Sequence, residues 1–302
     1  MTGKKILNLI LFLTVFIFSQ SVEIEKDFKY KKYTLPDKYT VTLGKKKIVR
    51  EYQWEKKKNE INKLEEYLTG YSAYGNLRNY KNLMGTAPAI DGKTVDTFGV
   101  SRQAAIPLYS NSQQPKLIRY GRDGAFIGII DRGEKYTLIN VYGIEGEWMV
   151  ENRYIKVSPV KEFKKLIFVD RKYQHSASLE KVGEIWKIRS MNPVTTGLEK
   201  PPYSLETPAG VFMIQEKTPK MLYLKEGSKT EIEGYAPYGM RFSRGAYLHG
   251  FPVVGVDSPQ IEYSGTLGTK PRSHMCVRNA TSHAKFLYSW VEPLKTLVFV
   301  IE

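Results

Sequence analysis

Residues 273–278 read SHMCVR and hold the only cysteine of this 302-residue chain. The thiolate is the reactive form of cysteine, and both Arg278 and the start of a following helix would lower the pKa of the thiol. A tight turn before a helix also directs backbone N–H groups at one point, as an oxyanion hole requires. The flanking serine, histidine and arginine argue against a purely apolar pocket. We therefore interpret Cys276 as a nucleophile.

The chain around this segment has the pattern of a mainly β domain. Apolar residues at helical spacing predict a helix over 284–291, which Thr281 or Ser282 would cap and Pro293 would end. Short apolar or alternating runs predict strands at 166–169, 184–189, 210–214, 246–249 and 296–301. We expect residues 159–302 to form one β-rich α+β unit.

Several motifs of this unit resemble the L,D-transpeptidases, which have a YkuD-type catalytic domain. The family pattern is His-Gly on a strand, then Ser/Thr-His-Gly-Cys, an apolar residue and Arg or Asn. The resemblance covers about residues 163–302 and implies that family's fold and activity. The matching stretches are TTG at 195–197, ETPAGVF at 206–212, MRF at 240–242, YLHG at 247–250 and the SHMCVR segment.

The resemblance assigns a role to each residue of the reacting centre. Cys276 is the implied nucleophile, and His249 is the general base, oriented by the backbone carbonyl of Gly250. The N–H groups of Met275 and Cys276, with His274, would form the oxyanion hole. An unperturbed histidine titrates near neutrality, so we expect acylation to depend on pH there and to lose that dependence without His249.

Four further residues are implied in substrate binding. Arg278 would hold a substrate carboxylate or the turn itself, and Ser273, Phe242 and Met240 would line the site.

Two departures from the family pattern bear on the site. Met275 replaces the usual glycine, so the turn either avoids a positive φ there or is strained. The gap between His249 and Ser273 is also longer than usual, and we expect residues 254–269 to form a loop over the site.

The implied reaction is acyl transfer on peptidoglycan. Members of the family cleave the bond between an L-centred diamino acid and the terminal D-alanine of a stem peptide. The thioester then passes to the amine of another stem, which makes a 3→3 cross-link, or to water or a protein amine. Carbapenems acylate the family's thiol. The alternatives are an L,D-carboxypeptidase, in which water accepts the acyl group, and a non-catalytic wall-binding protein.

Other kinds of chemistry find little support in the sequence. Cysteine and histidine are zinc ligands, but His249, His274 and Cys276 show no spaced metal motif. We expect neither a metal nor a cofactor, and the chain has no glycine-rich phosphate loop. We interpret His175 and His283 as surface or capping residues.

The upstream part of the chain is expected to form two further regions. Residues 22–92 are basic and partly helical, with Ile61 and Leu64 on the apolar face of a helix that starts at Trp54 and with the lysines of 56–58 on its solvated side. Residues 93–158 contain short strands separated by glycine turns. Their order resembles a small bacterial SH3-like barrel, which would bind the wall or act as a spacer.

The first 21 residues have the pattern of a signal peptide. Lys4 and Lys5 precede an apolar run over 6–18, and SQS at 19–21 is a small-x-small cleavage site. The alternative is an uncleaved anchor, which would be the only contact with the membrane. We expect export to the periplasm or cell wall of a bacterium.

The charge of the chain points to an anionic partner. The formal net charge of +15 suits anionic wall polymers. No nucleic-acid-binding motif is present, so we expect no nucleic-acid partner.

Overall fold

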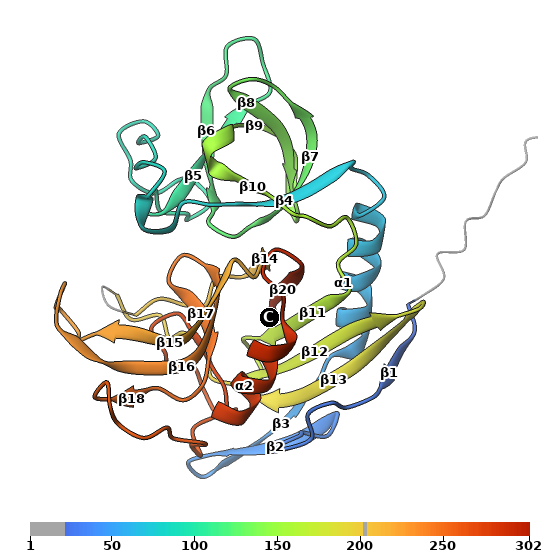
Figure 1. Ribbon diagram of the computed structural model, residues 1–302, viewed down its shortest axis with the longest axis vertical. Helices are drawn as coiled ribbons and strands as arrows, with labels where there is room; N and C mark the ends of the chain where they lie inside the picture. Colours follow the sequence, from blue (N-terminus) through green and yellow to red (C-terminus); the bar gives the residue numbers. More distant parts are fainter. Residues whose placement is uncertain (1–21, 202–203) are drawn as a thin grey trace, which may run out of the picture.

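The computed structural model describes residues 22–201 and 204–302, so the expected signal peptide lies outside the described residues. Within these ranges the chain forms three sheets, one separate hairpin and two α-helices (Figure 1). The predicted mainly β, α+β class is therefore confirmed. No helix of the described ranges has both the length and the apolar character that a membrane crossing needs.

A six-stranded sheet lies at the centre, and both of its faces are covered. Residues 166–169 of its interior strand β11 (Lys165–Asp170) are an unbroken apolar run because successive side chains enter different cores. Leu166 and Phe168 belong to one core, and Ile167 and Val169 to the other. The sheet order is β1 (Ile24–Lys26), β13 (Ile185–Pro193), β12 (His175–Val182), β11, β20 (Thr296–Ile301) and β14 (Gly210–Met213).

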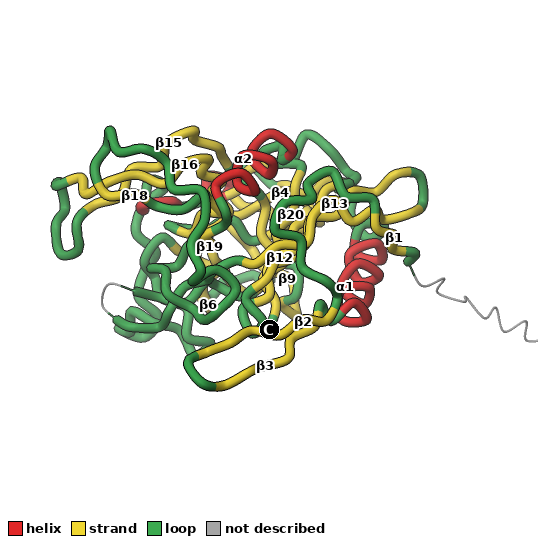
Figure 2. The backbone as a smooth tube through the Cα atoms, turned by 90° about the horizontal axis from the view of Figure 1, so that it is seen from below, coloured by secondary structure: helices red, strands yellow, loops and turns green. Residues whose placement is uncertain are grey.

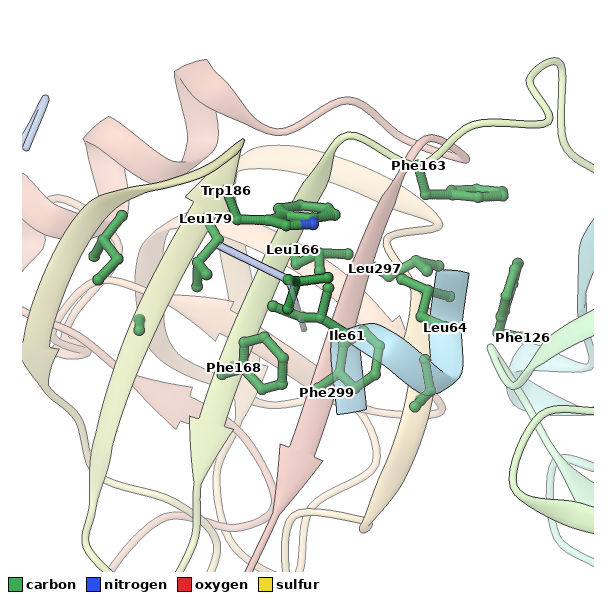
Figure 3. Packing of buried hydrophobic residues seen from close by; sticks show 14 of the residues in the cluster. Ile61, Leu64, Phe126, Phe163, Leu166, Phe168, Leu179, Trp186, Leu297 and Phe299 are labelled. Carbon is green, nitrogen blue, oxygen red and sulfur yellow. The ribbon is translucent and has the colours of Figure 1, made fainter. Parts of the chain in front are cut away.

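Helix α1 (Trp54–Tyr67) covers the first face of this sheet. Ile61 and Leu64 are fully buried and point toward the side chains of the sheet, Phe168 and Phe299 among them (Figure 3). The predicted helix and its apolar face are confirmed.

The expected position of the lysine run is wrong for Lys57. This residue precedes Ile61 by four positions, so it shares the buried face of α1 instead of the solvated one. Its Nζ donates a hydrogen bond to the carbonyl of Tyr52 and lies 5.5 Å from the centre of the Tyr52 ring. Burial lowers the pKa of Lys57 to about 8.

A five-stranded sheet and helix α2 (Thr281–Trp290) cover the second face. Leu248, Met240 and Phe242 from this sheet share a core with Leu287 of α2. Figure 2 shows the two helices on different sides of β12, β13 and β20. The strand order is β15 (Glu216–Leu224), β16 (Ile232–Ser243), β17 (Ala246–His249) and β19 (Val277–Arg278), with β18 (Val253–Val254) paired to β16.

Helix α2 begins without the predicted side-chain cap. Its N-cap is Ala280, and Thr281 and Ser282 are already helical. The free N–H of Ser282 donates instead to Oε2 of Glu262, at 3.0 Å. A carboxylate from a distant loop therefore fills the position that the sequence assigned to a local hydroxyl.

A seven-stranded antiparallel sheet stands apart at the top of Figure 1. The strand of this sheet that comes first in the sequence, Ala73–Leu77, precedes the predicted boundary at residue 93. Part of the predicted region 22–92 therefore belongs to this sheet. The short strands predicted for residues 93–158 are present in this sheet. The order is β10 (Ile155–Val157), β4 (Ala73–Leu77), β7 (Phe126–Arg132), β8 (Tyr136–Val141), β9 (Ile144–Glu151), β5 (Ala105–Ser110) and β6 (Leu117–Arg122), with short 3-10 helices at Tyr80–Asn82 and Asn152–Tyr154.

Residues 24–51 are built into the unit that contains Cys276. Strand β1 pairs in parallel with β13 and so extends the central sheet. The hairpin of β2 (Lys38–Leu43) and β3 (Lys46–Glu51) is joined to the same unit through Arg50, a buried side chain that donates to the carbonyl of Tyr173 at 2.8 Å.

Candidate active site

Strands β17 and β19 bring the residues of the two principal motifs together. They pair in parallel, with Leu248 opposite Val277 and His249 opposite Arg278. Leu248 and Val277 enter the core, and strand side chains alternate between faces. His249 and Arg278 therefore share the other face of this pair. Cys276 comes directly before Val277, the first residue of β19.

Cys276 is a neutral thiol at rest. Its side chain is partly buried, and Sγ donates a hydrogen bond of 3.4 Å to the carbonyl of Gly245. Burial raises the pKa of the thiol to about 11, against smaller opposing effects of the Tyr247 N–H and of Arg278. The expectation that Arg278 and a helix end make this a low-pKa thiol is therefore wrong for the resting site, because desolvation has the larger effect.

His249 is a neutral imidazole in the same state. Nδ1 lies 2.6 Å from the carbonyl oxygen of Gly250, which is the contact that the resemblance implied. Because a carbonyl only accepts hydrogen bonds, the proton is on Nδ1 and the lone pair of Nε2 is free to accept one. Burial, with a smaller contribution from the charge of Arg278, lowers the pKa of His249 to about 4.

Met275 occupies a strained backbone conformation in the turn before Cys276. Its φ is 148°, in the region that favours glycine, which is the residue of the family pattern at this position. Thr207 holds the turn, since its Oγ1 donates to the carbonyl of Met275 at 2.7 Å and accepts from the N–H of Gly197 at 2.8 Å. The N–H of Met275 makes only a long contact of 3.4 Å, to Oγ of Ser273.

The structure corrects three of the implied substrate-binding residues. Met240 and Phe242 are completely buried in the core between the sheets, so their side chains are not available to a substrate. Ser273 is also buried, and its hydroxyl donates to the carbonyl of Cys276, which makes it a support of the turn. His274 lies on the surface.

Arg278 remains available for a substrate. Its backbone pairs with Thr195, with N–H···O distances of 2.8 and 3.0 Å. No carboxylate in residues 22–201 or 204–302 forms an ion pair with its guanidinium. Burial lowers its pKa, which remains that of a cation at neutral pH.

Buried polar residues missed by the sequence analysis support this strand pair. Asn279 follows Arg278, and its side-chain amide donates to the carbonyls of Val277 and His249, at 3.0 and 3.3 Å. Its Oδ1 lies 3.0 Å from Nδ1 of His283, and Nε2 of that histidine lies 3.0 Å from Oγ of Ser190. The interpretation of His283 as a surface or capping residue is therefore wrong, and the same holds for the fully buried His175.

The loop after β18 is joined to the N-terminal region. Glu262 forms an ion pair with Lys32 at 2.9 Å, and Tyr263 stacks on Tyr33 with 4.3 Å between ring centres. Arg50 donates to two carbonyls near the end of the same loop. That the loop covers the reacting centre stays a prediction.

A family model matches the unit that carries these residues. Residues 164–300 match the L,D-transpeptidase catalytic domain family, YkuD. This match contains His249, Cys276 and Arg278, and members of the family are acyltransferases. A search of the curated proteins finds no match.

Solved structures similar to this chain include several L,D-transpeptidases. One from Mycobacterium smegmatis is 17% identical with a TM-score of 0.36, over 57% of this chain and 69% of that one. One from Stackebrandtia nassauensis is 24% identical with a TM-score of 0.32, over 46% and 56%. L,D-transpeptidase 3 from Mycobacterium tuberculosis, with a faropenem-derived adduct, is 16% identical with a TM-score of 0.36, over 52% and 73%.

Proposed function

We propose, from the match of residues 164–300 to the L,D-transpeptidase catalytic domain, that this protein is an exported peptidoglycan L,D-transpeptidase that forms 3→3 cross-links. The observation that carries the proposal is the pairing of β17 with β19. It brings the histidine motif on β17 beside the cysteine motif that leads into β19, within the matched domain.

Cys276 and His249 would act as a neutral pair. As Sγ attacks the carbonyl carbon of the diamino acid, Nε2 of His249 takes the thiol proton. The peptide bond then breaks, and D-alanine leaves as an amine that takes this proton. The amine of a second stem peptide attacks the thioester and transfers a proton to His249, which passes it to the leaving sulfur; this restores the neutral thiol and completes the cross-link.

Two features of the site would assist this reaction. The strained turn leaves the N–H of Met275 weakly bonded, so this group would bind the developing oxyanion, together with the N–H of Cys276. Arg278 would bind a carboxylate of the stem peptide, because this cation has no carboxylate partner within the described parts of the chain.

The remaining regions are assigned by proposal as well. A signal peptide over 1–21 would direct export, and the SH3-like module with the positive charge would retain the protein on anionic wall polymers. The upstream parts would be the basic region 22–92, of which β4 pairs within the seven-stranded sheet, and the SH3-like region 93–158, with residues 159–302 as the catalytic domain.

Analysis of cell walls from expressing cells tests the reaction. Digested wall should contain 3→3 cross-linked dimers by mass spectrometry, and cells that express Cys276→Ala should lack them. Shortened stems without new dimers would indicate the L,D-carboxypeptidase instead. Walls that are the same with both proteins would indicate a non-catalytic wall-binding protein.

A further inference from the structure

Asp123 joins the seven-stranded sheet to the five-stranded sheet. It follows β6 and is completely buried. Oδ2 accepts hydrogen bonds of 2.8 Å from Nη1 of Arg241, Nε2 of Gln215 and the backbone N–H of Arg244. Oδ1 accepts one of 2.7 Å from the N–H of Asn79 in its own part of the molecule. One carboxylate therefore bonds to both sides of the junction.

Two of the hydrogen bonds of Asp123 are made with the turn over 243–246, which connects β16 to β17; one of them comes from the N–H of Arg244. The hydroxyl of Ser243 donates to the carbonyl of Asp123 at 2.7 Å. Arg244 has a φ of 42°, a conformation that a residue with a side chain keeps only when its surroundings hold it. The next residue is Gly245, whose carbonyl accepts a hydrogen bond from the thiol of Cys276. The same short turn thus contacts Asp123 and the nucleophile.

The junction is close-packed at the residue that follows Asp123. Gly124 has a φ of 83°, and a Cβ built there would lie 1.7 Å from the carbonyl oxygen of Phe242. Its own carbonyl accepts the N–H of Met213 at 2.9 Å. Backbone meets backbone at this point, so the junction leaves the turn little freedom to shift.

We propose that Asp123 is a positioning residue for Cys276, through which the docked seven-stranded sheet fixes the turn 243–246 and the resting place of the thiol. The inference rests on the proposed function, in which Cys276 is the nucleophile. It gives the upstream sheet a part in the reacting centre in addition to wall binding or spacing.

The reactivity of the thiol reports on this arrangement directly. Cys276 is the only cysteine, so the rate of alkylation by iodoacetamide measures this one side chain. Burial and the hydrogen bond to Gly245 both stabilise the neutral thiol. Two groups favour the thiolate, namely the N–H of Tyr247 and the guanidinium of Arg278. They lie on β17 and β19, outside the turn, and His249 is on the same pair of strands.

Asp123→Asn should therefore lower the pH midpoint of alkylation. A fall of one pH unit would raise the rate at neutral pH about tenfold, because the thiolate fraction rises by that factor. Arg241 keeps its second carboxylate partner, Glu216 at 2.7 Å, so the variant retains a bonded guanidinium. Acylation by a stem peptide should decrease in the same variant, because the sulfur has lost its fixed position.

Asp96→Asn is the matched control. Asp96 is also buried, and it accepts hydrogen bonds from the N–H groups of Phe98, Val100 and Tyr120, all in the seven-stranded part of the molecule. Its substitution should weaken that part without moving the alkylation midpoint. An equal shift in both variants, or a shift in neither, would overturn the proposal.

Ser243→Ala keeps the test decisive if Asp123→Asn does not fold. It removes one hydrogen bond between the turn and Asp123 and should move the midpoint in the same direction by a smaller amount. An unchanged midpoint in this variant would overturn the proposal. Alkylation needs no peptide substrate, so a wild-type protein without transpeptidase activity would contradict the proposed function and leave this test intact.

Discussion

His249 and Cys276 are both uncharged at rest, which sets the pH dependence of the proposed reaction. Burial lowers the pKa of His249 to about 4 and raises that of Cys276 to about 11. Over the range between these values the imidazole can accept a proton and the thiol still has one to give. The pair therefore differs from a thiolate–imidazolium ion pair, and proton transfer must accompany the attack.

The pH profile of acylation should follow from these values. As pH falls through about 4, His249 gains a proton and can no longer act as a base, so acylation should fall there, not near neutrality as the sequence suggests. Stopped-flow measurement of acylation by a stem tetrapeptide at different pH values gives this acid limb, the fall in rate as pH decreases. His249→Gln should be slower by about 10²–10⁴-fold and should lack the limb.

His274→Ala is the control for this prediction. His274 is exposed, so its replacement should keep both the limb and most of the rate. If His274→Ala removes the limb and His249→Gln keeps it, the two histidines have the opposite roles.

At the scale of the elements, face periodicity explains what the sequence predicted and what it missed. The apolar residues of α1 predicted its helix, but Lys57 lies on the same face and becomes buried with Ile61. Met240 and Phe242 are two residues apart on β16, so both point into the core. A motif names residue types without saying which face of a strand they occupy.

Lys57→Met should stabilise the protein at neutral pH. Burial lowers the pKa of Lys57 from 10.5 to about 8, so its charge disfavours the folded state below pH 8. This cost decreases between pH 8 and 10.5, where the folded state loses the proton first. Urea unfolding should show a gain of about 1–3 kcal/mol at pH 7 and a smaller gain near pH 10.

Lys58→Met tests the neighbouring position, where the lysine is partly exposed and pairs with Glu55. It should change the unfolding free energy little at either pH, because surface ion pairs contribute about 0–1 kcal/mol. A loss of stability in Lys57→Met at pH 7 would show that the hydrogen bond to Tyr52 outweighs the desolvation of the ammonium group.

At the scale of the whole molecule, the sequence predicted the strands of residues 159–302 better than the contacts between regions. The strands and motifs of residues 159–302 follow from local patterns. Asp123 carries no local signal, since a charged residue before a glycine is typical of an exposed turn, and its partner Arg241 lies 118 residues away. Buried polar junctions of this kind depend on how distant segments meet.

The buried His283 should make the stability of the fold sensitive to acid. Burial lowers the pKa of His283 to about 3 from an ordinary value of 6.5. Between these values the unfolded chain binds a proton that the folded chain does not, so stability falls as pH decreases through this window. One such group changes the unfolding free energy by about 1.4 kcal/mol per pH unit.

Replacing His283 by glutamine should remove its share of this dependence. From pH 7 to pH 5, urea unfolding of the wild type should lose about 2 kcal/mol more than unfolding of the variant. His175, whose pKa burial lowers to about 2, remains in both proteins and does not affect the difference. An equal loss in both proteins would mean that His283 takes up a proton in the folded state.

The central claim is that Cys276 forms the acyl-enzyme, and the intact mass of the protein after exposure to a carbapenem tests it most directly. Attack by the thiol opens the β-lactam ring without a leaving group, so the protein should gain the full mass of the compound. Peptide mapping should place that mass on Cys276, and Cys276→Ala should gain none. A carbapenem adduct of the same mass on Cys276→Ala would contradict the account.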